Sequence, residues 1–332
     1  MAKVSPTPLT LQQMKTFATN GPELRLKASA FLHNELQIRF ARAVVELSEL
    51  PLGLNETAPV KMAIANYTTF LHDVAAMKAP STPEEDAIFT SRITQMKKQG
   101  SNLVPMICGG LHTIKTTSRG IDALRLQDVQ DDLNTRLDTF FLSRIGIRML
   151  IGQHSKDGGR VKLTDVQDIV NEAVARASAL CAAFCGPPPP VLVRVVENGN
   201  APFMYVRSHL HHMVLCYSAM IWRLDLTIKI SDEGGGVPRS EWRKLWQYTY
   251  STADDDMDPS IFQGQVNFRD HFCGGGYGLP ISRLFARYFG GEVTFVSSEG
   301  FGSSVFIQAH RLGKQAELVP GHTNFTLQPL TF

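Results

Sequence analysis

Two clusters of glycine in the second half of the chain contain residue types that could do chemistry. The first follows a short alternating strand pattern and contains Asp232, Gly234 and Gly236. A carboxylate at the end of a strand can accept a hydrogen bond from an adenine amino group, while glycine lets the backbone approach a flat ring. The sequence therefore predicts an adenine contact at Asp232, with the two glycines beside it.

The second glycine cluster lies just before a predicted helix that begins at Pro280. Its members are Gly274, Gly275, Gly276, Tyr277, Gly278 and Leu279. Backbone N–H groups and the positive end of the helix dipole at such a junction suit phosphate groups. The spacing matches neither a Walker P-loop, which needs Gly-Lys-Ser/Thr, nor the dinucleotide fingerprint. Two simple turns are the alternative interpretation of the two clusters.

Composition excludes several classes of protein. The 33 Lys and Arg nearly balance the 31 Asp and Glu, so no strong basic field is available to bind nucleic acid. No stretch approaches 18 consecutive apolar residues, so we expect no membrane span. The five cysteines are odd in number and scattered, which argues against a disulfide framework and indicates a reducing compartment.

Helical periodicity dominates the first half of the chain. Apolar residues recur at helical spacing over residues 23–50, after Thr57, after Ser81-Thr82-Pro83, and over residues 126–154. Four amphipathic helices predict a four-helix bundle over residues 23–155. Residues 1–22 contain no acid and no arginine, so we expect a disordered N-terminus there rather than an Arg-rich transit peptide.

The second half of the chain mixes helix and strand signals. The polar, glycine-containing residues 155–160 are the best domain boundary. Helices are predicted at residues 164–184, 208–223 and 280–289, and strands at residues 191–196, 226–230, 292–297 and 304–308. This pattern predicts an α+β domain over residues 160–312, with helices on one face of a mixed sheet, followed by a tail at residues 313–332.

Asp-x-Gly-x-Gly, a variable segment and then Gly-x-Gly-x-Gly-Leu resembles the nucleotide site of the GHKL ATPases. Longer strings narrow the resemblance, and they lie at residues 30–39, 142–154, 248–253, 276–283 and 288–291. On these strings the chain is similar, nearly from end to end, to the mitochondrial pyruvate dehydrogenase kinase and branched-chain ketoacid dehydrogenase kinase family. The similarity is greatest to the plant pyruvate dehydrogenase kinases.

The resemblance implies a fold, an activity and partners. The helical half would dock the lipoyl domain of the acyltransferase core, and the second half would be a GHKL (Bergerat) α/β sandwich that binds ATP and Mg²⁺. The kinase would phosphorylate serines of the dehydrogenase component of the pyruvate dehydrogenase complex in the mitochondrial matrix, as a homodimer joined through its sheet. Asp232 matches the adenine contact; the lid and phosphate contacts match Ser251, Thr252 and residues 274–279, and Ser303 stands where the family usually has Thr.

The chain departs from the family on one helix. There the family has a general-base Glu and, four residues later, a Mg²⁺-binding Asn, but here those positions are Cys216 and Met220. A thioether is a poor Mg²⁺ ligand and an ordinary thiol is a poor base. Residues 201–224 contain no Asp, Glu or Asn. His212, where the family has a histidine thought to assist the Glu, is the catalytic candidate left, and we expect no intact metal site.

A loop and a strand are missing as well. In the family they separate this helix from the strand before Asp232, and here only residues 221–224 remain between the two. Two explanations stay open. Either coding sequence was skipped in the gene model, which the abrupt join favours, or the chain is a pseudokinase that docks on the complex without phosphoryl transfer. Whether the substrate is the pyruvate or the branched-chain complex also stays open, although residues 250–252 and 276–278 favour pyruvate.

Overall fold

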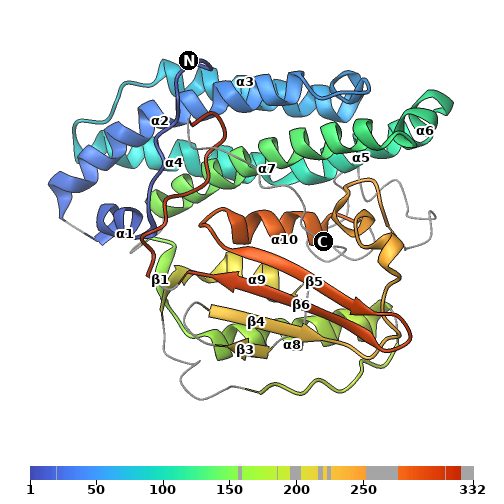
Figure 1. Cartoon of the computed structure of the whole chain (residues 1–332). Coiled ribbons are helices and arrows are strands. Elements are labelled where there is room, and N and C mark those ends of the chain that lie inside the picture. Colours follow the sequence, from blue (N-terminus) through green and yellow to red (C-terminus); the bar gives the residue numbers. More distant parts are fainter. Residues whose placement is uncertain are drawn as a thin grey trace.

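The structure is a computed structural model that describes residues 1–19, 21–155, 159–184, 186–194, 203–215, 220–222, 226–251, 276–310 and 312–322. It has a layer of long helices above a sheet with its own helices, as Figure 1 shows. In the described residues no helix is long and apolar enough to cross a membrane. The fold is α+β, as the sequence predicts.

The upper layer is helical throughout. Its elements are α1 (Leu11–Thr19), α2 (Pro22–Ser48), η1 (Leu54–Glu56), α3 (Ala58–Ala76), α4 (Pro83–Gln99), η2 (Gly100–Asn102), α5 (Leu103–Lys115), α6 (Ser118–Leu124) and α7 (Gln127–Ser155). The helix starts predicted from proline in the first turn are confirmed at α3 and α4. Helix α2 begins one residue before the predicted start, at Pro22. At α4 the Thr82 hydroxyl also accepts the Glu85 N–H at 3.3 Å.

Helix α5 is an element that we did not predict, so the layer has more than the four helices expected. Pro105, Gly109 and Gly110 within it resemble chain breakers. Packing explains Gly110, because a Cβ there would lie 2.8 Å from side-chain atoms of Thr57 and Val60. Glycine is therefore what lets α5 approach α3 closely.

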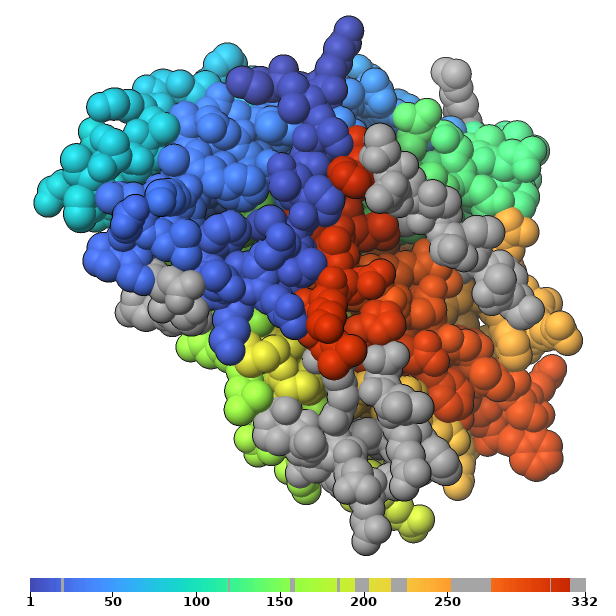
Figure 2. Space-filling view, turned by 60° about the vertical axis from the view of Figure 1, so that its left-hand side comes forward, coloured from blue at the N-terminus to red at the C-terminus, as the bar shows by residue number. Residues whose placement is uncertain are grey.

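The N-terminal residues are ordered by contacts, unlike the disordered N-terminus that we predicted. Leu11 and Met14 of α1 are buried, and Thr10 forms a β-bridge with Ala316. In the space-filling view of Figure 2 the dark blue N-terminal segment runs beside the red C-terminal segment. The prediction was wrong because the partner of this segment lies some 300 residues away.

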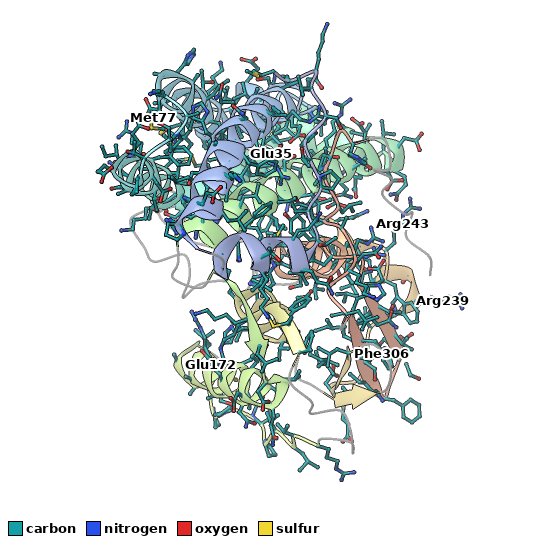
Figure 3. The ribbon with its side chains drawn as sticks, turned by 90° about the vertical axis from the view of Figure 1, so that its left-hand side faces the viewer. Glu35, Met77, Glu172, Arg239, Arg243 and Phe306 are labelled. Carbon is teal, nitrogen blue, oxygen red and sulfur yellow. The ribbon has the colours of Figure 1, made fainter. Side chains whose placement is uncertain are left out.

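A buried ion network fastens these two segments to the helical layer. Arg39 of α2 bonds Glu35 at 2.8 Å and Glu317 at 2.7 Å, with all three side chains almost fully buried. The same carboxylates accept the backbone N–H groups of Thr7 and Leu9 at 2.9 and 3.1 Å. Glu35 is labelled in Figure 3, inside the helical layer. Every charge in the network is paired, as burial requires.

The lower layer contains two antiparallel sheets. Its elements are β1 (Val161–Thr164), α8 (Val166–Phe184), β2 (Phe203–Val206), α9 (Arg207–Leu215), β3 (Met220–Trp222), β4 (Leu226–Ser231), η3 (Arg239–Glu241), η4 (Lys244–Trp246), α10 (Gly278–Arg287), β5 (Glu292–Ser298) and β6 (Gly302–Ala309). The larger sheet has the order β3-β4-β6-β5 and the smaller one pairs β1 with β2. Among the described strands every pairing is antiparallel, unlike the mixed sheet that we predicted. Residues 195 and 196 of the strand predicted over residues 191–196 lie outside the described residues.

Two further predictions in this half differ from the structure. The helix expected over residues 208–223 ends at Leu215, and Met220–Trp222 instead pairs with β4 as β3. This pairing covers part of the β4 edge, whose backbone groups would otherwise lack partners. Residues 191–194, expected to begin a strand, are irregular after the four prolines, and Leu192 is exposed.

The two layers share one continuous apolar core. Helix α10 contacts α7 above and β5 below, and α8 and α9 lie beside it on the same side of the larger sheet (Figure 1). Residues of the larger sheet that face these helices are buried, among them Ile228, Val293 and Ile307. The site residues at the end of β4 and at the start of α10 are thus positioned by one packed body.

Candidate functional site

Asp232 directly follows β4, and its carboxylate is held by backbone groups. Because Ser231 pairs with Ser304 in register, Asp232 lies opposite Ser303, and its N–H donates to the Ser303 carbonyl at 2.9 Å. Its Oδ1 accepts the N–H groups of Gly234 at 2.8 Å and Ser303 at 3.4 Å. The residue is exposed, and among the described residues no hydrogen bond reaches Oδ2. This oxygen can therefore accept a hydrogen bond from a ligand.

The glycines after Asp232 meet the demands of a tight turn over the β5–β6 hairpin. Gly235 and Gly236 have φ values of +86° and +73°, which favour glycine. A Cβ at Gly236 would lie 2.2 Å from the Ser298 carbonyl oxygen. The Gly235 carbonyl accepts the Gly300 N–H at 2.7 Å. Local packing thus explains these glycines, whether or not a ligand binds.

A pair of serines braces this turn from below. The Ser297 hydroxyl accepts the Val237 N–H at 2.7 Å and lies 3.0 Å from the Ser303 hydroxyl. The structure thus brings the predicted residues Asp232 and Ser303 together. The Ser303 hydroxyl already has a partner in Ser297, which fixes its position at the edge of the turn.

The second cluster begins at a close contact with the segment that precedes it. Gly276 has a φ of +75°, and a Cβ there would lie 2.0 Å from the Tyr250 carbonyl oxygen and 3.7 Å from the Ser251 Cβ. Tyr277 is buried and Gly278 begins α10, which has no side-chain N-cap. In the described residues no side chain accepts the first N–H groups of α10, so they can donate to a ligand. The side chain of Leu279 packs against the core.

Several predicted residues lie outside the part of the chain that the structure describes. They are Thr252, Gly274 and Gly275, expected at the phosphates, and Cys216, at the position of the family base. The structure therefore brings together Asp232, Gly234, Gly236 and Ser303 at one place, and Ser251 and Gly276 at another.

His212 lies on α9, packed against α10. Its ring meets Phe285 edge-to-face at 5.0 Å, and Phe285 also packs on His209 at 4.5 Å. Burial, helped by the neighbouring His211, lowers the pKa of His212 to about 4. The imidazole is therefore neutral at physiological pH. It can accept a proton or a hydrogen bond, but with that pKa it is a weak base.

The residues described here offer no evident Mg²⁺ site. They contain no group of three or more His, Cys, Asp or Glu side chains that could hold a metal ion. Met220 lies in β3, so it does not continue the α9 helix that carries His212. The donor set that is described does not fit Mg²⁺, which prefers hard oxygen ligands, and we derive no step through the ion.

Tyr248 and Tyr277 connect the second cluster to the helical layer. The sequence predicted Tyr277 as part of the cluster, but it gave no role to Tyr248 and did not predict the contacts of either with the helical layer. The Tyr248 hydroxyl donates to Asp138 of α7 at 2.7 Å, and the buried Tyr277 side chain interacts with the thiol of Cys108 on α5. Burial raises the pKa of Asp138 to about 6. The only signal was a carboxylate beside Leu137 and Phe140 in an apolar helical stretch.

An apolar pocket opens between α1, α2 and α7. Its lining is Leu9, Met14, Phe17, Ala18, Ala28, Phe31, Leu32, Leu150, Gln153 and His154. At its polar end, Nε2 of His154 lies 3.0 Å from Oδ1 of the buried Asp86. The Gln153 amide donates to the Met14 carbonyl at 2.9 Å. The pocket can take an aliphatic group that carries a polar end.

The chain is similar in sequence to known protein kinases of mitochondria. A family model described as mitochondrial branched-chain alpha-ketoacid dehydrogenase kinase matches residues 8–156. The chain is 33% identical over 350 aligned positions to the mitochondrial [pyruvate dehydrogenase (acetyl-transferring)] kinase of Arabidopsis thaliana, covering 95% of this chain and 93% of the relative. It is 32% identical to isozyme 4 of that kinase from Mus musculus and 30% identical to the Drosophila melanogaster kinase, covering 95% of this chain and 84% of each relative.

Proposed function

Because the chain belongs to the family of mitochondrial pyruvate dehydrogenase kinases, which are protein serine kinases, we propose that it phosphorylates the dehydrogenase component of the pyruvate dehydrogenase complex. ATP is the phosphoryl donor, serine hydroxyls are the acceptors, and the phosphorylated dehydrogenase is inactive. The relatives are mitochondrial by name, and we assign the activity to the matrix. Pyruvate dehydrogenase is preferred to the branched-chain enzyme because the relatives compared are named for it.

The observation that carries this proposal is the backbone-held carboxylate of Asp232. With Oδ1 fixed by the N–H groups of Gly234 and Ser303, Oδ2 would accept the adenine amino group. The glycine turn keeps side chains away from the ring. Ser251 and the N–H groups at the start of α10 would meet the phosphates, which favour the positive end of a helix.

Proton removal from the serine is the weakest part of the site. His212 is the described candidate, and its pKa of about 4 makes it a poor acceptor for a hydroxyl proton at neutral pH. Mg²⁺ would supply charge stabilisation to the transferred phosphoryl group when bound. We therefore expect slow transfer from the chain as written.

A second candidate function follows from the same weakness: a pseudokinase that docks on the complex. The alignment with the Arabidopsis relative runs over 350 positions, more than the 332 residues of this chain, so the relative has residues without a counterpart here. No carboxylate or Asn lies between residues 201 and 224. Docking would then be the whole activity.

Incubation with the dehydrogenase complex and labelled ATP separates the two functions. Serine labelling well above that of Asp232→Asn, the matched control, supports the kinase. Binding to the complex with labelling no higher than the control supports the pseudokinase and overturns the first proposal.

Docking would use the apolar pocket between α1, α2 and α7. A lipoyl group is an aliphatic chain that ends in a dithiolane ring, and the pocket presents apolar side chains from three helices, with Phe17 and Phe31 stacked at 6.1 Å. Phe31→Asp, which puts a charge against that chain, should abolish binding of a lipoylated domain and leave nucleotide binding unchanged. Equal binding by the lipoylated and unlipoylated domains would exclude this role.

The open face of the larger sheet suits a second copy of the chain. Helices α8, α9 and α10 lie on the other side, and in the described residues no helix covers this face (Figure 1). It presents Phe306 of β6, labelled in Figure 3, with the Lys229 ammonium 5.8 Å from the ring centre. Val296 on β5 is 47% exposed. A homodimer through this face is part of the proposal, and light scattering of Phe306→Glu tests it.

A further inference from the structure

Tyr248 ties the segment before Ser251 to the helical layer. Its hydroxyl donates to Oδ1 of Asp138 at 2.7 Å, and its N–H donates to the Asn134 side chain at 3.2 Å, both on α7. Its ring packs on Phe141 at 5.3 Å between centres. The Tyr248 side chain is completely buried. Three kinds of contact therefore fix one residue that precedes a predicted phosphate contact by three positions.

Tyr277 makes the equivalent connection from the start of α10. Its side chain is buried and interacts with the thiol of Cys108 on α5, which is also buried in the helical layer. The rings of Tyr248 and Tyr277 lie 6.2 Å apart. Two helices of the upper layer thus hold the two segments of the second cluster at adjoining points.

The two anchored segments touch each other through their backbones. The Gly276 Cα lies so close to the Tyr250 carbonyl that a Cβ would come within 2.0 Å of the oxygen. A small shift of either tyrosine would therefore change the spacing of Ser251 and Gly276. Because closely packed backbones cannot be compressed, a displacement of one segment moves the other segment with it.

Asp138 is half-buried, so its carboxylate gives up part of its hydration to hold the Tyr248 hydroxyl. The carboxylate also faces Arg283 and Arg287 of α10, which both pair with Glu292. An apolar contact could supply the same cohesion without a desolvated charge. The hydrogen bond also orients the Tyr248 ring, because the hydroxyl must point at the Asp138 oxygen to donate to it.

We propose that Asp138 and Tyr248, with Cys108 and Tyr277 beside them, are positioning residues of the nucleotide site. The helical layer sets through them the spacing of Ser251 and Gly276 to which the phosphates of ATP bind. The inference deepens the proposed function and rests on it. The helical half would thus influence nucleotide affinity directly, through α5 and α7, and independently of whether a lipoyl group occupies the pocket between α1, α2 and α7.

Calorimetry with a non-hydrolysable ATP analogue tests the pair. Tyr248→Phe and Asp138→Leu should each weaken binding between about two- and thirtyfold, the range for residues that couple to a site without touching the ligand. The double variant should be no weaker than the worse single variant. Asp138→Asn keeps an acceptor for the tyrosine hydroxyl and should bind within about twofold of the wild type.

Asp131→Asn is the matched control, because Asp131 also joins α7 to the lower layer, through an ion pair with Arg243 at 2.5 Å, but on the surface. Arg243 is labelled in Figure 3. It should leave affinity unchanged. Folded Tyr248→Phe and Asp138→Leu variants that bind as the wild type does would overturn the inference. So would an Asp138→Asn variant as weak as Asp138→Leu.

Hydrogen exchange without nucleotide distinguishes this inference from the proposed function. In Asp138→Leu the amides of Ser251 and Gly276 should exchange faster, while the amide of Gly234 keeps its wild-type rate. If the wild type binds no nucleotide but exchange changes in this pattern, the proposed nucleotide site fails and the connection between the layers stands. If exchange is unchanged or rises uniformly, the positioning role is wrong.

Discussion

The two glycine clusters are held in place by different means. The turn after Asp232 rests on the β5–β6 hairpin, through exposed or half-buried backbone and serine contacts within the lower layer. The segments around Gly276 are fixed by buried tyrosines that reach into the helical layer. The first cluster therefore depends on its own sheet, whereas the second depends on the other half of the molecule. A site built in this way can bind a base locally and have its phosphate contacts adjusted from a distance.

Gly276→Ala should have the largest effect on the second cluster. The new Cβ would meet the Tyr250 carbonyl at 2.0 Å in a left-handed conformation, and we expect a loss of at least about 3 kcal/mol in the free energy of unfolding. Gly235→Ala is the matched control, since its φ is +86° but nothing lies within 4 Å of the Cβ. It should cost only the conformational term of about 1–2 kcal/mol. If urea denaturation gives equal losses of unfolding free energy for the two variants, the close contact at Gly276 does not contribute to stability.

Asp138→Asn should change how the stability of the protein depends on pH, because Asp138 holds Tyr248 beside the second cluster with a raised pKa. Since the folded-state pKa of Asp138 is about 6, above its ordinary value of 3.8, its contribution to stability is present below about pH 4 and lost as pH rises through 6. The uncharged Asn lacks this dependence. The variant should therefore become more stable than the wild type between pH 4 and 6, by up to about 3 kcal/mol at pH 8. Thermal unfolding across this range checks the sign, and a constant difference would contradict it.

Asp232→Asn should weaken nucleotide binding at the first cluster without disturbing the turn. Asn keeps an oxygen for the Gly234 N–H but can present a donor to the adenine amino group. Loss of a charge-assisted hydrogen bond costs about 1.5–3 kcal/mol, roughly ten- to a hundredfold in affinity. Calorimetry with an ATP analogue measures this, and unchanged affinity would remove Asp232 from the site.

Mg²⁺ should make the smallest difference, because neither cluster supplies a metal ligand set in the described residues. We expect nucleotide affinity to change by less than about tenfold, or 1.4 kcal/mol, between buffer with Mg²⁺ and buffer with a chelator. A larger gain with Mg²⁺ would mean that a side chain outside both clusters binds the ion.

The sequence predicted the helices and strands whose formation depends on neighbouring residues along the chain. The periodicity of α7 and the alternation in β4 were sufficient, as were the proline-marked helix starts, and β4, β5 and β6 are confirmed near their predicted positions. Helix α5 was missed because Gly110 is there for packing against α3 and not to break the helix. Strand β3 was mistaken for helix because three residues carry no periodicity.

The candidate site was predictable to a similar extent. A carboxylate after a strand is visible in the sequence, and Asp232 is at the end of β4. That Ser303 lies opposite Asp232 follows from the register of β4 and β6, and these two residues are 71 positions apart in the sequence. The bond between Asp138 and Tyr248 joins residues 110 positions apart, and no short motif encodes it.

The buried network of Glu35, Arg39 and Glu317 also has a consequence for the order in which the chain is made. The Leu9 N–H finds its acceptor, Glu317, 308 residues later in the sequence, so a growing chain cannot make this hydrogen bond until Glu317 has been synthesised. Until then Arg39 has Glu35 and the Thr7 carbonyl beside it but not Glu317, and Thr10, just before α1, lacks its bridge to Ala316. Closing so long a loop is slow. The helical layer, although translated before the lower layer, therefore cannot complete this network until the lower layer has been synthesised.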